Sequence, residues 1–96
     1  MTDPDIFEFC LYIAGDTLNS GRAVANLRTI CQTYLPGRYK IELVDVFKDP
    51  DRALEERIFM TPTLLKLGPA PMERIVGNLS NTNLVLQALD IGKLII

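Results

Sequence analysis

The sequence predicts a single α/β domain whose strands and helices follow the order β-α-β-α-β-β-α. Three observations lead to this prediction: an apolar run at residues 7–14, helical periodicity at residues 23–34, and a second strand pattern at residues 39–47. Two strands joined by one helix of this length are expected to be parallel, with a right-handed crossover. A chain of 96 residues has room for one compact core, so residues 1–96 are expected to form one domain.

The first strand is expected at residues 7–14, which read Phe-Glu-Phe-Cys-Leu-Tyr-Ile-Ala. A nearly continuous apolar run indicates a strand buried on both faces, at the centre of a sheet. Gly15 ends this strand, and Asn19 or Ser20 can cap the helix that follows. Apolar residues then recur at helical spacing until Pro36 ends the helix.

The second strand is expected at residues 39–47, where apolar and charged residues alternate before an apolar end. Asp49 followed by Pro50 is typical of a helix start, because proline at the first helical position loses no hydrogen bond. A short helix is therefore expected to run to about Arg57. The pattern of residues 52–60 also fits, in part, a strand.

The last third of the chain predicts a hairpin and a helix. Residues 63–67 and 73–76 have strand patterns and flank a turn rich in glycine and proline, which favours an antiparallel pair. Ser80 can cap a last helix with apolar residues at helical spacing up to Ile91. The complete order is that of the thioredoxin fold.

Composition excludes several classes of function. The net charge of -2 provides no positive field for nucleic acid or anionic lipid. Apolar runs fall far short of the roughly 20 residues of a membrane span, and the first residues lack a basic signal segment. With only two cysteines, the chain suits a reducing compartment, and we expect a cytoplasmic protein. Histidine is absent, which removes the usual general base and the commonest metal ligand.

A thioredoxin-type oxidoreductase needs a cysteine at the start of the first helix, where the helix dipole lowers the thiol pKa. Residues 14–20 contain none. Cys10 and Cys31 fall on apolar stretches, so both are expected to be buried and inert. Acidic pairs such as Glu55 and Glu56 are interpreted as solvated helix surface. We therefore expect no catalytic residue, metal or cofactor, with a thiol oxidoreductase as the alternative function.

Two further motifs bear on partners. Thr61-Pro62-Thr63 precedes a strand at the place where thioredoxin-like proteins carry a cis-proline beside the active site, although it could also be a rigid strand entry. Leu94, Ile95 and Ile96 form an apolar end, which favours packing against a neighbour and hence oligomerisation. A plain oligomeric scaffold is a third possible function.

Several motifs spread over most of the chain together resemble the KaiB family. They lie at residues 11–17, 19–20, 22–23, 44–46, 49–50, 61–64, 74–80 and 89–90. The resemblance implies a non-catalytic adaptor of a clock system that binds the hexameric ATPase KaiC and regulates its phosphorylation and output. It also implies that KaiA or a pathway with a SasA-like histidine kinase takes part.

The resemblance further implies two folds for one sequence. One is the thioredoxin-like monomer that binds KaiC, and the other is a self-associated form, a dimer or tetramer, of order β-α-β-β-α-α-β, which we expect in a crystal because concentration favours oligomers. The proline-rich second half is the expected bistable element. We assign the switch to Thr61, Pro62, Pro69, Pro71, Gly77, Asn78 and Asn81.

By the same resemblance, six residues match positions tied to folding or partner contact. They are Tyr12, Arg22, Lys48, Arg57, Lys66 and Arg74. Basic side chains suit steering toward an acidic partner surface. The chain departs from the family pattern at Leu18, Gly21, Ala25, Glu42 and Glu73, which leaves a stress or timing role without KaiA as an alternative.

Gly77→Ala is expected to alter the balance of oligomer and monomer, because alanine has poor access to the positive φ angles that glycine adopts. Sedimentation velocity of the variant and the wild type measures this balance. An unchanged profile would count against a switch at this position.

Overall fold

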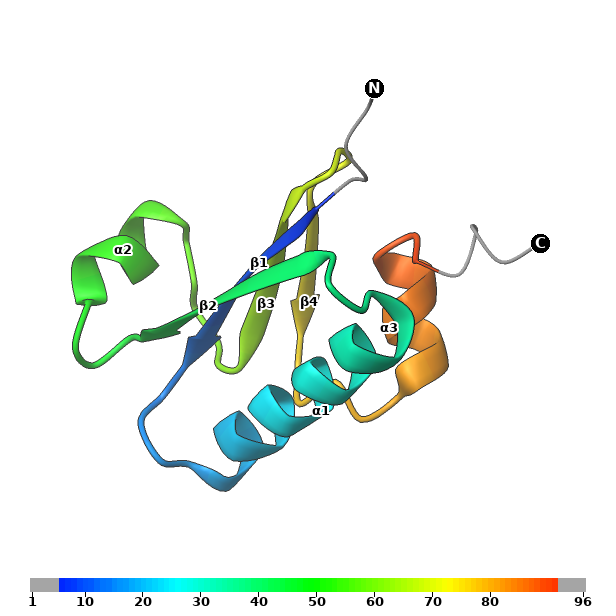
Figure 1. The fold of residues 1–96 in the computed structure, drawn as a ribbon. Coiled ribbons are helices and arrows are strands. Elements are labelled where there is room, and N and C mark those ends of the chain that lie inside the picture. The colour runs from blue at the N-terminus through cyan, green and yellow to red at the C-terminus, as the bar shows by residue number, and fades with distance from the viewer. Residues whose placement is uncertain (1–5, 92–96) are drawn as a thin grey trace.

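The computed structural model describes residues 6–91, and a four-stranded sheet lies at its centre (Figure 1). The spatial order of the strands is β2-β1-β3-β4. Strand β1 is parallel to β2 and antiparallel to β3, and β3 is antiparallel to β4. The strands are β1 at Phe7–Ile13, β2 at Tyr39–Asp45, β3 at Thr63–Gly68 and β4 at Glu73–Val76.

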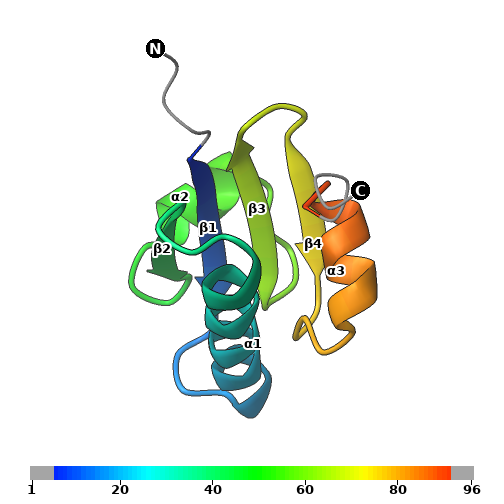
Figure 2. The same ribbon diagram turned by 45° about the vertical axis from the view of Figure 1, so that its right-hand side comes forward.

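Three helices cover the two faces of the sheet (Figures 1 and 2). Helices α1, Leu18–Tyr34, and α3, Thr82–Ala88, lie on one face, and the short helix α2, Pro50–Glu55, lies on the other. The predicted order β-α-β-α-β-β-α and the thioredoxin-like architecture are therefore confirmed. The order β-α-β-β-α-α-β of a self-associated form stays a prediction.

Alternation along β1 divides the core into two parts. Phe9 and Leu11 point toward α1 and α3 and belong to the larger core cluster. Cys10 and Tyr12 point to the opposite face and belong to a smaller cluster beside α2. Because β1 is buried on both faces, its continuous apolar pattern correctly predicted a central strand.

The helix starts differ in part from the predictions. Helix α1 begins at Leu18 with Thr17 as its N-cap, so the expected caps Asn19 and Ser20 lie inside the helix. Ser20 is instead buried, and its Oγ accepts a hydrogen bond from the Ala14 N–H at 3.0 Å. This bond connects the helix to the end of β1, which is why a polar side chain is retained at a buried position.

The other two helices have side-chain caps. Asp49 caps α2 as predicted, accepting from the Arg52 N–H at 3.4 Å with Pro50 at the first helical position. Helix α3 is capped by Asn81, which accepts from the Leu84 N–H at 3.2 Å, so the expected cap Ser80 lies one residue too early. Leu94, Ile95 and Ile96, from which oligomerisation was expected, lie outside the described residues.

Lys66 is a buried cation next to the larger core cluster, with 1% of its surface exposed. Its Nζ donates a hydrogen bond at 3.3 Å to the carbonyl oxygen of Leu89, the residue that ends α3. The same ammonium lies 5.8 Å from the centre of the Phe7 ring. A cation suits the C-terminal end of a helix, where carbonyl groups lack helical donors. Lys66 thus attaches α3 to the sheet.

Replacing Lys66 with methionine is expected to lower the free energy of unfolding by about 1–3 kcal/mol, because the buried Leu89 carbonyl loses a charged donor. Urea unfolding measures the loss, and amide hydrogen exchange should accelerate first in α3. Lys40→Met removes an exposed lysine from β2 and serves as the control, with a change of at most about 0.5 kcal/mol. Equal changes in both variants would contradict a specific role for Lys66.

Candidate functional site

Strand register brings four connecting segments to one end of the sheet. Ile13 pairs with Asp45 at the ends of β1 and β2. Thr63, at the start of β3, pairs with Tyr12 of β1 and with Val76 at the end of β4. We call this part of the molecule the loop end, and it consists of residues 14–18, 46–49, 58–62 and 77–81.

Asp45 connects two of these segments. Its Oδ1 accepts hydrogen bonds from the N–H groups of Gly15, at 3.3 Å, and Phe47, at 2.9 Å. Gly15 has a φ of +54°, and a Cβ added there would lie 3.6 Å from the Phe47 ring. The positive φ therefore favours glycine at this turn, while an added Cβ would make only an ordinary van der Waals contact with Phe47.

Hydrogen bonds also connect the other two segments. The Thr61–Pro62 peptide is cis, and the Pro62 carbonyl accepts from the Gly77 N–H at 2.9 Å. The Asn78 carbonyl accepts from Nδ2 of Asn26, on α1, at 2.8 Å. The segment before β3, the segment after β4 and helix α1 are thus held together.

The loop end exposes four large apolar side chains, which we call the apolar cluster. Their exposed fractions are 70% for Leu18, 74% for Phe47, 81% for Phe59 and 65% for Met60. Side chains of this size are usually buried, and exposed groups of them mark interaction surfaces. The cluster offers apolar contact area at the place where the redox cysteines of a thioredoxin-type oxidoreductase would lie.

An open groove of about 510 Å³ lies between the first connecting segment, strand β2 and the start of α2. Its charged lining residues are Asp16, Glu42, Asp45, Lys48, Asp49 and Arg52. Arg52 forms an ion pair with Glu42, and Asp45 is occupied by two backbone donors. The groove is therefore a mixed-charge surface in which side-chain and backbone contacts already use several of the charges.

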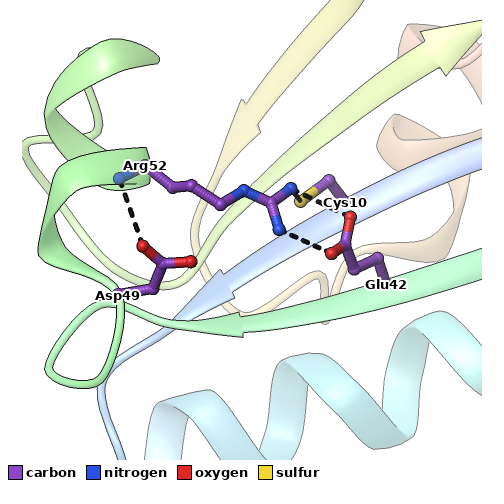
Figure 3. Close-up of polar contacts among 4 residues, drawn as sticks. All are labelled: Cys10, Glu42, Asp49 and Arg52. Carbon is purple, nitrogen blue, oxygen red and sulfur yellow. Dashed lines mark hydrogen bonds and ion pairs between the residues drawn. The ribbon is translucent and has the colours of Figure 1, made fainter.

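Figure 3 shows how Arg52 covers one of the two cysteines. Its Nη2 lies 2.9 Å from Oε1 of Glu42 and 3.8 Å from Sγ of Cys10. The hydrogen bond from Arg52 lowers the pKa of Glu42, so the ion pair stays charged at more acidic pH than an unpaired glutamate would. The pair joins α2 to β2, directly above the thiol.

Both cysteines are buried, as predicted. Burial raises the pKa of Cys10, and burial alone raises that of Cys31 to about 12. Tyr12, beside Cys10, has its pKa raised to about 12 by burial and by its hydrogen bond with that thiol. At neutral pH the thiols are therefore protonated, the opposite of what a redox nucleophile requires.

The structure separates the six predicted contact residues into three groups. Arg22, Lys48 and Arg57 are exposed at or next to the loop end. Tyr12 and Lys66 are buried, with 1% of the surface of each exposed, so in this fold their side chains offer no contact area to a partner. The sixth residue, Arg74, is described below.

Arg74 is exposed on β4 but already has partners. Its Nη2 donates to the Glu56 carbonyl at 2.7 Å, and its Nη1 donates to the Arg57 carbonyl at 3.1 Å. Both carbonyls lie just after the end of α2 at Glu55. Arg74 therefore holds the end of α2 against the sheet in this fold.

Most of the predicted switch residues come together at the loop end. Thr61, Pro62, Gly77 and Asn78 meet through the bond between Gly77 and Pro62, and Asn81 caps α3 nearby. Pro69 and Pro71 lie in the turn between β3 and β4, at the other end of that hairpin, and the peptide bonds before both are cis. Gly77 has a φ of +124°, so alanine would be strained there.

Sequence reasoning missed three residues that build this site: Asp45, Asn26 and Arg52. Asp45 and Asn26 act on backbone groups that are distant in sequence, which no local pattern reveals. Arg52 had a weak signal, since it lies three residues after the cap Asp49 on a predicted helix. Its partner Glu42 could only be found once the strand and helix were placed.

Within residues 6–91, no group of three or more histidine, cysteine, aspartate or glutamate side chains could hold a metal ion. In the same part of the chain, no helix has the length and apolar character needed to cross a membrane.

The fold and the loop end define a class: a thioredoxin-fold protein in which the first helix begins without a cysteine. The KaiB domain matches residues 10–91, and the chain belongs to the KaiB family. Circadian clock protein KaiB3 of Synechocystis is 49% identical over 81 residues, covering 84% of this chain and 79% of the relative. A circadian clock oscillator protein KaiB of Prochlorococcus marinus is 48% identical, covering 84% and 69%.

Solved structures support the fold. The N-terminal domain of SasA from Synechococcus elongatus matches with a TM-score of 0.74 at 19% identity, over 94% of this chain and 89% of that chain. Chloroplastic thioredoxin z matches with a TM-score of 0.76 at 21% identity, over 93% and 80%. At such low identity the likeness concerns architecture alone. The family membership, with curated relatives named as clock proteins, places the chain in circadian timing.

The native protein is expected to react slowly with thiol reagents at neutral pH, at least about tenfold slower than the unfolded chain, because both thiols are buried and protonated. Native and denatured thiol titration measures the difference. The variants Cys10→Ser and Cys31→Ser assign any residual reaction. Fast native modification of either cysteine would contradict this description.

The raised thiol pKa values also predict alkaline destabilisation. Cys31 loses its proton near its ordinary value of 9.0 in the unfolded chain but only near 12 in the folded protein. The unfolded state therefore binds fewer protons between these values, so stability is full below pH 9 and falls as the pH rises toward 12. Cys31→Ala should flatten this fall in pH-dependent unfolding. An unchanged pH profile would exclude Cys31 as a cause.

Proposed function

We propose that this protein is a non-catalytic adaptor that binds a hexameric, KaiC-like ATPase through the loop end and regulates its phosphorylation and output in a clock system. The proposal rests on membership of the KaiB family and on the apolar cluster at the loop end. We further propose that the adaptor acts in the cytoplasm and communicates with KaiA or with a SasA-like kinase pathway.

The observation that carries the proposal is the chemistry of the loop end. A redox protein needs an accessible thiolate at the start of α1, and this chain has Thr17 and Leu18 there instead. Phe59 and Met60 precede the cis-proline and expose most of their surface. Aromatic residues and methionine are enriched in binding surfaces because they bury large areas on contact. The end of the molecule is therefore suited to binding a protein.

Three exposed cations lie in, or one helical turn beyond, the segments that carry this apolar area. Arg22 lies on the second turn of α1, Lys48 follows β2, and Arg57 precedes Phe59. All three basic side chains are exposed. Apolar contacts at the centre supply affinity, while basic residues at the rim accelerate encounter with an acidic partner surface. We propose these three as the contact cations in this fold.

The double variant Phe59→Ala, Met60→Ala is expected to raise the Kd for the cognate KaiC-like ATPase at least about tenfold, because it removes two exposed anchors. Size-exclusion chromatography with ATP or ADP detects the complex, and fluorescence titration measures the Kd.

Met72→Ala is a matched control, because Met72 has the same exposed fraction of 65% and lies in the turn at the opposite end of the sheet. It should leave the Kd unchanged. A wild-type protein that forms no complex in either nucleotide would overturn the proposed function. A normal Kd in the double variant would move the contact away from the loop end.

A further inference from the structure

We propose that Met60 is an oxidation site through which a hydroperoxide regulates partner binding. Conversion of its thioether to the sulfoxide weakens the contact that the loop end makes, and reduction of the sulfoxide restores it. The inference rests on the proposed function, because Met60 belongs to the apolar cluster that carries that function. The modification acts on the thioredoxin-like form itself and requires no change of fold.

The sulfur atoms of residues 6–91 divide into buried thiols and exposed thioethers. Cys10 and Cys31 expose only 1% and 0% of their surface. Burial also raises the pKa of both thiols, so little thiolate is available to a hydroperoxide at neutral pH. Met60 and Met72 each expose 65%, and a thioether needs no ionisation before it reacts. In this part of the chain, the two methionines are therefore the sulfur atoms that an oxidant in solution reaches.

The backbone on both sides of Met60 is anchored. The N–H of Ile58 donates to the Ala53 carbonyl at 2.8 Å, and the Ile58 side chain packs against the smaller cluster beside α2. On the other side, Oγ1 of the buried Thr63 donates to the Met60 carbonyl at 2.6 Å. Phe59 and Met60 thus form a short exposed tip between anchored neighbours. A sulfoxide formed on Met60 is held on the surface that the partner contacts.

The reaction transfers one oxygen atom and two electrons. The thioether sulfur attacks one peroxide oxygen, an S–O bond forms and the O–O bond breaks. The departing oxygen takes up the proton of the transferred hydroxyl group and leaves as water or an alcohol, so sulfur is oxidised and the peroxide is reduced. A methionine sulfoxide reductase reverses the change with two thiols, which become a disulfide while the oxygen leaves as water.

Oxidation changes the chemistry of the contact. A methionine thioether is apolar and adapts to irregular apolar surfaces, whereas the sulfoxide is polar and carries a hydrogen-bond acceptor. Burying that oxygen against apolar groups without a donor opposes binding, and we expect the Kd to rise at least about fivefold. Met72 lies in the turn between β3 and β4, at the opposite end of the sheet from the apolar cluster. Its oxidation should leave the Kd unchanged.

The test compares the wild type, Met60→Leu and Met72→Leu before and after treatment with hydrogen peroxide, which is removed before binding is measured. Peptide mass spectrometry of the native protein follows the addition of one oxygen to each methionine, and circular dichroism checks that the fold is kept. Fluorescence titration with untreated cognate ATPase gives the ratio of the Kd after treatment to the Kd before it. We expect a rise of at least about fivefold in the wild type and in Met72→Leu, and no rise in Met60→Leu. Treatment with a methionine sulfoxide reductase should return the wild-type Kd to its original value.

The possible failures separate the oxidation site, its regulatory effect and the proposed function. A Met60 that gains no oxygen in the native protein would overturn the oxidation site. Oxidised Met60 with an unchanged Kd would overturn the regulation and leave the proposed function intact, and an equal rise in Met60→Leu would assign the effect to another residue. An untreated wild type that forms no complex would overturn the proposed function and the regulation with it, while the mass spectra still decide whether Met60 is oxidised.

Discussion

The burial of β1 on both of its faces is the constraint on which the rest of the structure depends. A strand with apolar side chains on both sides needs a cover on each face and a neighbour along each edge. Helices α1 and α3 cover Phe9 and Leu11, and on the opposite face α2 places Arg52 over Cys10. Strands β2 and β3 satisfy the two edges. Because β2 is parallel to β1 and β3 is antiparallel to β1, the end of β1, the end of β2 and the start of β3 lie at the same end of the sheet. The connecting segments therefore meet at the loop end.

Two cations, Lys66 and Arg74, donate to carbonyl groups at helix ends. Lys66 donates to the end of α3, and Arg74 donates to the carbonyls that follow α2. Both match positions that the family resemblance ties to folding or partner contact. In this fold their donors hold helix ends, so a partner that engaged either side chain would compete with a helix for it. Any such contact would therefore be coupled to the packing of α2 or α3.

In this thioredoxin fold, burial makes both cysteine thiols poorly reactive. Cys10 lies under the Arg52–Glu42 ion pair, and Cys31 lies in the larger core cluster. Desolvation opposes the thiolate at both sites. The loop end carries the cis Thr61–Pro62 peptide and the glycine turn at Gly15, and it exposes Phe47 and Phe59.

Sequence by itself determined the element order, the central position of β1, the absence of a cysteine at the start of α1 and the burial of both thiols. These properties follow from local patterns, because apolar periodicity and residue type act over a few positions. Only the tertiary structure decided that Lys66 is buried, that Asp45 joins two connecting segments and that Arg52 pairs with Glu42. It also decided where two helices start. Helix α1 starts at Leu18, and Ser20 accepts from the Ala14 N–H instead of capping, whereas α3 starts at Thr82 after the cap Asn81. Each of these depends on groups outside the local segment or on which of several neighbouring polar residues becomes the cap, and a local pattern does not determine either.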